Sequence, residues 1–458
     1  MLNDRPGMKS MMKVSIRKII IFLLVLSSLV PDIGIKVSTL GFNWTFYRTA
    51  VFVCILLYLQ GPKNTGRVVI RSSYRSWRMF LAVWLIYGIS LMILSPYRNL
   101  HNGFVELLAV FNGAVCMYLL VSSVRKETDL EEIAGIIFYV CIVLTVFGIF
   151  EILTGFHLPT SYFNSADAAH VTGRTKCATG IFYNENDFSS FLTCFAPIVL
   201  YSKKRRILSA FCFIGIIYIN HMNDANICIL AMIVGAVFYF VFIRQYGRRN
   251  QHVVRCIIAL GVAIAAVMIW KNIDYLSNNN TLLYVIRTQQ LNAENAHGSL
   301  YIRLVMYIDS VRAAMDTRFL GIGPASFMNY FTAHPSASKL VDPHNMYFEV
   351  LVEYGLVIMV AFAGCLFRLI IVFRKKILRA YDKNIHRKLT VGCEMIVLYC
   401  IVCIAPSSFI GYAWQWVVIT FGILLVGLPE KELSERTSHI KICVNKTGKY
   451  LVQDNPKI

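Results

Sequence analysis

The chain has 458 residues, of which 57% are hydrophobic and only 15% are charged, and its mean hydropathy is +0.59. A soluble protein carries about 25% charged residues, so this composition excludes an ordinary soluble enzyme and indicates one polytopic membrane domain. The formal net charge of +20 would suit a nucleic-acid-binding protein, but the positions of the basic residues argue against that class.

Apolar stretches recur along the chain, and a bilayer core of about 30 Å needs roughly 20 apolar residues per helix. We therefore predict an all-α membrane bundle over residues 18–428, between a cytoplasmic N-terminus (1–17) and a cytoplasmic tail (429–458). The predicted spans, about twelve in number by this length criterion, lie near 18–35, 43–60, 77–95, 104–123, 133–153, 179–201, 207–222, 226–243, 255–271, 345–372, 389–406 and 411–428.

The basic residues are distributed unevenly between the two sides of this topology. When the N-terminus is placed inside, 34 of the 45 Lys and Arg residues fall in the inner segments. Inner loops of membrane proteins carry such an excess, so we predict that both termini are cytoplasmic. The positive charge then lies next to anionic lipid, which removes the reason to expect a nucleic-acid partner.

Two long connections fall on the outer side, near 154–178 and 272–344. Loops this long usually carry structure or function. In the second connection, residues 299–315 have the spacing of an amphipathic helix, which we expect on the membrane surface or against the bundle. Its predicted apolar stripe comprises Leu300, Leu304, Tyr307, Ile308, Val311 and Met315, and Arg303, Asp309, Ser310 and Arg312 fall off that stripe.

The sequence Asp342-Pro343-His344-Asn345, at the start of the tenth span, has two interpretations. Asp342 and Pro343 can simply cap and begin a helix. Alternatively, His344 is a base at the membrane surface, with a pKa suited to accepting a proton near pH 7.

Asn345, Glu349 and Glu353 follow at intervals of four, so they share one helical face that descends about 12 Å into the membrane. Ionisable residues inside a span usually face a polar cavity or a partner. A wet cleft open to the outside and a structural polar seam between helices are both compatible with this face.

Further polar features lie on the predicted outer side. Gly321-Ile322-Gly323-Pro324 is either a plain turn or a backbone approach to an anion. Asn184 and Asn186 open the sixth span, either as a helix cap or as part of the same cleft.

Six basic residues also fall on the predicted outer side. Each alone is ordinarily solvated, but together they suit a diphosphate; they are Arg174, Lys176, Arg287, Arg303, Arg312 and Arg318. Nearly all of the 13 cysteines lie in apolar runs, and no His/Cys spacing suggests a metal site.

With these residues in view, the chain resembles the bacterial O-antigen ligase and O-antigen polymerase superfamily. The resemblance covers the topology and the large outer loop between spans nine and ten. GIFYNENDFSSFL looks like the Gly-x-x-x-Asn-x-Asn segment of that family, FLGIGPASF looks like its Gly-x-Gly-x-x-x-Phe turn, and PHNMYFEVLVEYG looks like its His-Asn motif followed by Glu-x-Gly.

The resemblance implies a bacterial cytoplasmic-membrane enzyme that transfers a glycan from undecaprenyl diphosphate to a hydroxyl, without a metal or other cofactor. It implies His344 as the general base on the acceptor, which is a glycan or a lipid carrier. Arg303 and the other outer arginines would hold the diphosphate, Asn184, Asn186 and Asn345 would line the site, and Glu349 and Glu353 would orient the histidine or bind sugar.

One departure from the family is that its Ser-Arg pair between spans seven and eight is replaced here by Asn223-Asp224-Ala225-Asn226. The sequence does not distinguish a polymerase from a ligase, although we favour a polymerase of cell-surface polysaccharide. The alternatives are a twelve-helix transporter or lipid-linked sugar flippase, which usually show a two-half repeat, and a membrane scaffold without activity.

Overall fold

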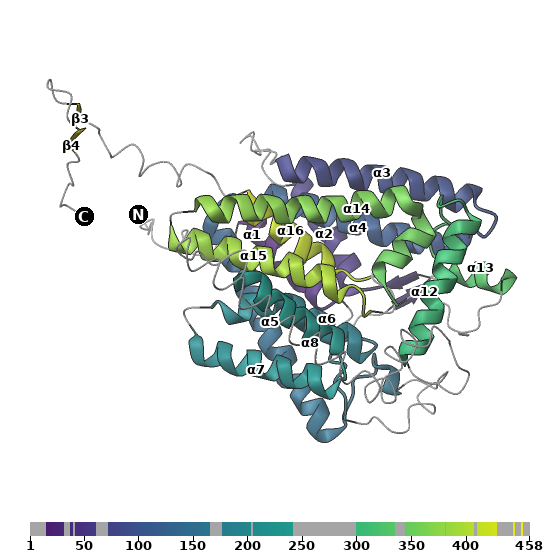
Figure 1. Ribbon diagram of the computed structural model, residues 1–458, viewed down its shortest axis with the longest axis horizontal. Helices are drawn as coiled ribbons and strands as arrows, with labels where there is room; N and C mark the ends of the chain where they lie inside the picture. The colour runs from purple at the N-terminus through teal and green to yellow at the C-terminus, as the bar shows by residue number, and fades with distance from the viewer. Residues whose placement is uncertain are drawn as a thin grey trace, which may run out of the picture.

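The computed structural model describes residues 15–31, 37–39, 42–60, 72–164, 176–202, 205–240, 299–334, 344–380, 382–406, 410–427, 443–444 and 450–451 (Figure 1). The helices are α1 (Ile16–Leu29), α2 (Phe46–Gln60), α3 (Ser72–Leu94), α4 (Leu100–Ser123), α5 (Glu127–Thr154), α6 (Glu185–Leu200), α7 (Arg206–Met222), α8 (Asn226–Phe238), α12 (Ser299–Asp316), α13 (Phe327–Ala333), α14 (Met346–Arg379), α15 (Lys383–Val402) and α16 (Trp414–Val426).

The remaining described elements are small. A short 3₁₀ helix covers Tyr162–Asn164, β1 (Val37–Thr39) pairs antiparallel with β2 (Phe42–Trp44), and β3 (Cys443–Val444) pairs antiparallel with β4 (Tyr450–Leu451). The protein is therefore a helical bundle with two minimal hairpins. The hairpins were not predicted from the sequence.

Each predicted span coincides with a described helix, except the one near 255–271, which lies outside the described residues. Within the described part, α3, α4, α5 and α14 are long and apolar enough to cross a membrane, and α2, α7, α8 and α16 are shorter apolar helices. The chain is thus a multi-pass membrane protein. The number of crossings, the position of the large loop and the side on which the termini lie remain predictions.

The helix α16 forms the centre of the bundle. Every residue from Trp414 to Val426 is buried, and the helix packs against α15, α4, α1 and α14. A helix that is apolar all round is stable only when it is enclosed. Gly113 of α4 lets the Trp416 ring approach closely, because an added Cβ would lie 2.2 Å from that ring.

The outer helices are apolar on both faces, as lipid contact requires. On α3, Trp77, Leu81 and Trp84 are buried in the bundle. The opposite face is exposed and equally apolar; it carries Met79, Val83, Ile86, Ile89 and Ile93. An exposed apolar stripe of this length is a liability in water, so this face is suited to acyl chains.

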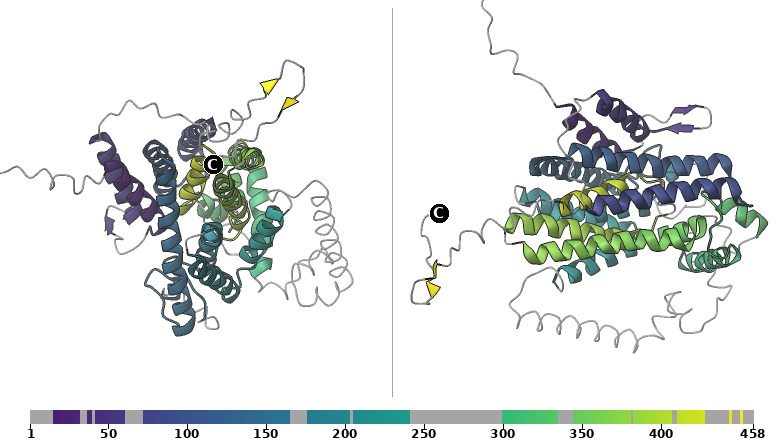
Figure 2. Two further views of the ribbon diagram at one scale, coloured as in Figure 1. Left: turned by 90° about the vertical axis from the view of Figure 1, so that its left-hand side faces the viewer. Right: turned by 90° about the horizontal axis from the view of Figure 1, so that it is seen from above.

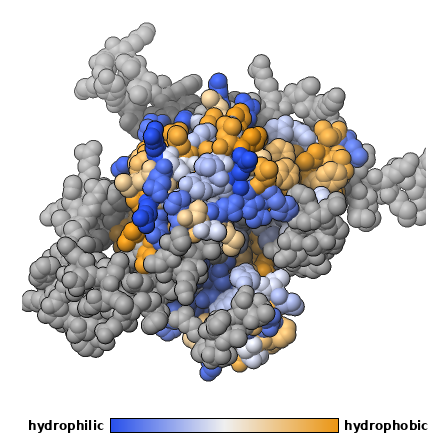
Figure 3. All heavy atoms as spheres, turned by 90° about the vertical axis from the view of Figure 1, so that its right-hand side faces the viewer, coloured by the Kyte–Doolittle hydropathy of each residue, from blue (hydrophilic) through white to orange (hydrophobic). Residues whose placement is uncertain are grey.

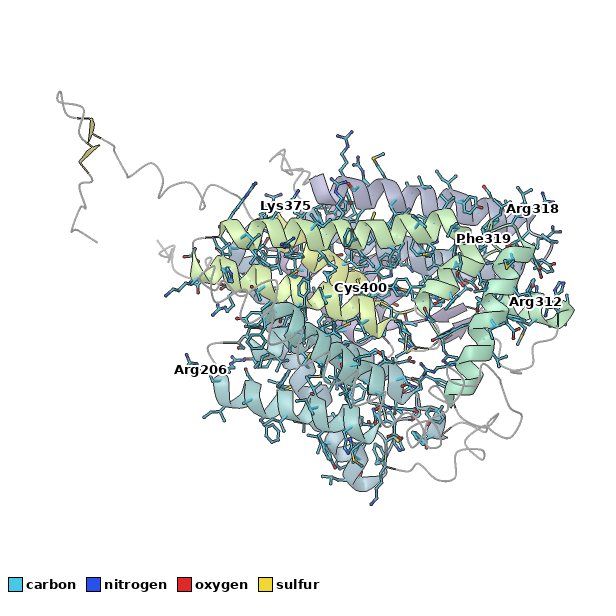
Figure 4. All side chains as sticks on the ribbon, viewed as in Figure 1. Arg206, Arg312, Arg318, Phe319, Lys375 and Cys400 are labelled. Carbon is cyan, nitrogen blue, oxygen red and sulfur yellow. The ribbon has the colours of Figure 1, made fainter. Side chains whose placement is uncertain are left out.

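Polar contacts define the two ends of the bundle. At one end, Lys18 of α1 pairs with Glu132 of α5 at 2.5 Å, and Arg368 of α14 donates to Ser76 of α3 at 2.7 Å. Figure 4 shows Lys375 and Arg206 toward this end and Arg312 and Arg318 at the other. These ends correspond to the predicted inner and outer sides, respectively.

The predicted helix at 299–315 is confirmed as α12, and part of its predicted apolar stripe is exposed. Ile308, Val311 and Met315 are exposed. Tyr307 of the stripe stacks on Phe348 of α14 at 4.7 Å, and the buried residues of α12 include Met306, Ser310, Ala313 and Ala314. The helix crosses the end of the bundle, roughly perpendicular to the long helices (Figures 1 and 2).

The sixth helix also begins later than predicted, at Glu185 rather than near residue 179. Gly180 has a positive φ of 58°, which ends any regular helix at that point. The N–H groups of Thr179 and Gly180 donate to the buried carboxylate of Glu151 at 3.1 Å and 2.6 Å. The apolar run therefore contains a docked turn before the helix.

A break in α14 is held by the glycine turn at 321–323. Gly355 has φ 81° and ψ 173°, so the helix is interrupted there. The N–H of Ile322 donates to the Val352 carbonyl at 2.8 Å, and that of Gly323 to the Glu353 carbonyl at 3.0 Å. These bonds satisfy carbonyls that a continuous helix would pair internally, as membrane helix breaks require.

The two glycines that face each other at this junction permit the contact. A Cβ on Gly321 would lie 2.6 Å from the Glu353 carbonyl oxygen, and one on Gly355 would lie 2.5 Å from that of Phe319. Both also have a positive φ. The turn thus contacts a helix backbone, and two of its N–H groups are already engaged, which disfavours the anion-binding interpretation of this motif.

We expect Gly355→Ala to destabilise the folded protein by about 2–4 kcal/mol, because it adds both a steric clash and an unfavourable φ. Gly364→Ala, on the same helix, is the matched control, since nothing lies within 4 Å of its added Cβ, and it should be neutral or slightly stabilising. Thermal unfolding of the purified variants in detergent measures both. Equal midpoints for the two variants would contradict the backbone lock.

Candidate active site

The first turn of α14 is fixed by its cap and by α15. The Asn345 side chain accepts from the N–H groups of Tyr347 at 3.0 Å and Phe348 at 3.5 Å. The helix therefore begins at Met346, and the cap is Asn345 rather than the predicted Asp342, which lies outside the described residues. The Tyr347 hydroxyl donates to the Cys400 carbonyl at 2.7 Å, which ties this turn to α15.

His344 immediately precedes this cap and has an unusual backbone conformation. Its φ of 46° lies in the left-handed region, where non-glycine residues are uncommon and backbone outliers often accompany function. Its side chain is half-buried, and the guanidinium of Arg303 on α12 lies close enough to affect its charge. Arg303 also reaches the Ala405 carbonyl at 3.5 Å.

Burial and the neighbouring Arg303 together lower the pKa of His344 to about 4. Both effects oppose the charged imidazolium. The pKa is therefore below the value near 7 that the sequence interpretation assumed. The imidazole is neutral at pH 7, so it can accept a proton, but its basicity in the absence of a ligand is weak.

The two glutamates of α14 lie inside the protein, with Glu349 4% and Glu353 3% exposed. They are directed away from lipid, and Tyr354 is within electrostatic range of both. The Tyr354 hydroxyl also donates to Glu106 of α4 at 2.5 Å. The two buried carboxylates and the half-buried Glu106 thus lie around Tyr354, between α14 and α4.

Glu106 was missed by the sequence analysis. It is the carboxylate near the start of the fourth apolar span, and an ionisable residue in such a span is itself a signal of function or pairing. Polar residues were weighed in the sixth and tenth spans, but this carboxylate of the fourth span was not.

The outer arginines do not converge on one point. Arg303 and Arg318 are fifteen positions apart along α12 and its C-terminal turn, which is about 20 Å at 1.5 Å per residue. Arg318 and Arg312 are exposed at the end of the molecule (Figure 4), as is Lys176. Arg174 and Arg287 lie outside the described residues. Arg303 is therefore the described arginine that the structure brings to His344.

The asparagines that open the sixth span have separate surroundings. Asn184 caps α6 by accepting from the Asp187 N–H at 2.9 Å, which is the capping interpretation considered above. Asn186 is half-buried in the first turn. Asp187 is buried and accepts from the Tyr412 hydroxyl, in the connection to α16. Asp187 stood inside the quoted motif but was not chosen as a site residue.

The turn that lacks the arginine of the family is held by an amide. Asn223 exchanges two hydrogen bonds of 2.8 Å with the backbone of Ala178 and donates to Ser189 at 3.0 Å. In the next turn, Cys228 contacts Ser190 of α6 at 3.8 Å and lies within electrostatic range of Arg303. Ser190, Cys228 and Arg303 thus place α6, α8 and α12 near one another at the end of the bundle that carries His344.

The surface at this end carries a hydrophilic patch (Figure 3). Figure 3 shows hydrophilic side chains across the middle of the face and hydrophobic ones toward its margins. In the part of the chain that the structure describes, no three His, Cys, Asp or Glu side chains are grouped as metal ligands. Metal independence of the reaction nevertheless remains a prediction.

Two comparisons with known proteins bear on this site. Residues 207–363 match the O-antigen ligase family. This segment includes α12, the glycine turn, His344 and the first part of α14 up to and beyond its break. The teichuronic acid biosynthesis protein TuaE of Bacillus subtilis (strain 168) is 23% identical over 366 residues, which cover 76% of this chain and 71% of that protein.

The matched segment contains the elements from which the site is built, and the second similarity extends over most of the chain. Both similarities point to the O-antigen ligase-like superfamily as the group of proteins that this chain resembles.

Proposed function

We propose that the protein is an integral-membrane glycan transferase of cell-surface polysaccharide biosynthesis. Its donor is an oligosaccharide on undecaprenyl diphosphate, and its acceptor is the hydroxyl of a growing glycan or of a lipid carrier. The observation that carries the proposal is the packing of α12 on the first turn of α14, where Tyr307 stacks on Phe348 and Arg303 lies within electrostatic range of His344. The family match and the similarity to a teichuronic acid biosynthesis protein support it.

The proposed reaction needs few groups. The acceptor oxygen attacks the anomeric carbon of the donor sugar, the bond from that carbon to the diphosphate breaks, and the diphosphate leaves with the electron pair. His344 takes the proton of the acceptor hydroxyl. Arg303 balances the charge of the leaving diphosphate through bidentate contacts.

The low pKa of His344 in the free protein is compatible with this scheme, because the negatively charged donor would raise it. Before binding, the Arg303 cation and burial hold the imidazole neutral. A bound diphosphate would place negative charge beside both side chains, which favours the imidazolium and raises the pKa of His344. The donor itself would thereby make the histidine a stronger base when the acceptor arrives.

The buried carboxylates have a separate role in the proposal. Glu349 and Glu353 lie one and two turns beyond Asn345 on the same helical face. A carboxylate in a low-dielectric site stabilises a nearby cation. We assign them to the stabilisation of the imidazolium or to contacts with sugar hydroxyls, together with Asn345. Asn184, Asn186 and Arg318 remain proposed contacts farther along the glycan.

His344→Ala should lower glycan transfer by about 10²–10⁴-fold, the usual contribution of a general base. The control is His386→Ala on α15, a half-buried histidine toward the opposite end of the bundle. A deletion strain carrying each variant is examined on a surface-glycan gel, with membrane levels of the protein matched.

Normal glycan in the His344→Ala strain would remove this residue as the base. In the same gel, single repeats left on lipid identify a polymerase, and long chains that remain on lipid identify a ligase. Donor retained on the inner leaflet would instead identify a flippase and overturn the proposal.

Arg303→Gln should raise the KM for the lipid-linked donor at least tenfold, since a charge-assisted hydrogen bond contributes about 1.5–3 kcal/mol. Arg312→Gln is the matched control, because Arg312 is exposed on the same helix. Transfer by purified protein is measured against donor concentration. Indistinguishable KM values for the two variants would exclude Arg303 from the diphosphate site.

The pH dependence of kcat/KM reports the ionisation of the free enzyme. We expect its acidic limb near pH 4 rather than near 6.5, because the pKa of His344 is lowered to about 4. Arg303→Gln removes one cause of the lowering, so its limb should move to higher pH. A wild-type limb at 6.5 that the substitution leaves in place would contradict this assignment.

A further inference from the structure

A cavity of about 640 Å³ opens at the end of the bundle opposite His344. It lies between α5, α6, α15 and α16, and its volume is in the range of small-molecule and cofactor sites. Its apolar lining comes from Leu130, Phe138, Ile198, Val391, Phe421 and Leu425. The site already described makes no use of this cavity.

Two arginines line the cavity and lack a carboxylate partner among the described residues. The Nη1 atom of Arg387 on α15 is buried and has no hydrogen-bond partner there. The guanidinium of Arg205 lies over the Tyr139 ring, 4.4 Å from its centroid. A buried guanidinium N–H without an acceptor is costly, and an anionic group in the cavity would satisfy Arg387.

The acidic side chains of the lining are already occupied. Lys388 donates to Glu131 at 2.7 Å and also to Glu127, so these three charges form one group at the rim. The Tyr201 hydroxyl, which also lines the cavity, donates to the buried Glu394 behind it at 3.2 Å. The lining as a whole holds the cations Arg205, Arg387 and Lys388 against the carboxylates Glu127 and Glu131, so it keeps a net positive charge.

The cavity is continuous with a surface suited to lipid. Tyr139, which lines it, begins an exposed apolar stripe along α5 that continues through Val143, Val146 and Phe150. An added Cβ on Gly135 would meet nothing within 4 Å, so this position leaves open space beside the arginines. A ligand with an anionic head and an apolar tail matches these features.

We propose that this cavity binds an anionic phospholipid, with the phosphodiester on Arg387 and Arg205 and an acyl chain along α5. Basic pockets between membrane helices are suited to such headgroups. A free phosphate offers the same chemistry to the arginines but makes no use of the apolar wall. A lipid bound there would contact both α5 and α15, so the packing of these helices would depend on the lipids of the leaflet at this end of the bundle.

The test uses full-length purified protein that has been delipidated in detergent. Binding of phosphatidylglycerol, phosphatidylcholine and inorganic phosphate is measured by native mass spectrometry and by the shift of the unfolding temperature. We expect phosphatidylglycerol to bind at least tenfold more tightly than phosphatidylcholine. Arg387→Gln should weaken the affinity for phosphatidylglycerol about tenfold, because a charge-assisted contact is lost.

Arg379→Gln is the matched control, because Arg379 is exposed near the end of α14 and does not line the cavity; its affinity should stay within twofold of wild type. Gly135→Phe fills the open space and should weaken lipid binding while sparing inorganic phosphate. If Arg387→Gln does not fold, Arg387→Lys replaces it, with an intermediate loss expected.

Equal affinity for the two lipids, or equal losses in the Arg387 and Arg379 variants, would overturn the proposal. Inorganic phosphate that binds as tightly as phosphatidylglycerol, with no effect of Gly135→Phe, would also overturn it in favour of a free anion.

Discussion

The arrangement of the proposed site depends on the break in α14 at Gly355 and on the turn that satisfies it. A membrane helix can be interrupted only if other groups take up the carbonyls that lose their partners. Here the N–H groups of Ile322 and Gly323 do so, with glycine on both sides of the contact. Because that turn follows α12 directly, the lock also fixes where the arginine-bearing helix crosses the end of the bundle.

This constraint explains how a surface helix and a membrane helix hold their proposed catalytic groups together. α12 packs along the first segment of α14, where the Tyr307 and Phe348 rings stack at 4.7 Å. Arg303 lies on one flank of this packing and His344 at its start. The cap by Asn345 and the bond from Tyr347 to α15 then limit movement of the histidine. Positioning of this kind is what a reaction with a good leaving group requires from its enzyme.

The two ends of the bundle differ in how their charged side chains are arranged. At the end of His344, carboxylates are buried between α4 and α14, and a single described arginine lies beside the histidine. At the opposite end, ion pairs such as Lys18 with Glu132 join neighbouring helices near the surface, and two arginines face a cavity with an apolar wall. Exposed ion pairs contribute little stability; the cavity arginines are better explained by a ligand.

The sequence by itself determined the membrane class and most of the helix positions, and it singled out His344, Glu349 and Glu353 as proposed site residues, because apolar length and an ionisable residue inside a span are local signals. It could not determine that part of the apolar stripe of α12 is exposed, since that depends on how the helix crosses the end of the bundle. Nor could it show that Arg303 rather than Arg318 lies within electrostatic range of His344, or that Tyr354 donates to Glu106 beside the two glutamates of α14. Those relations join helices far apart in the chain, and only packing around the broken helix decides them.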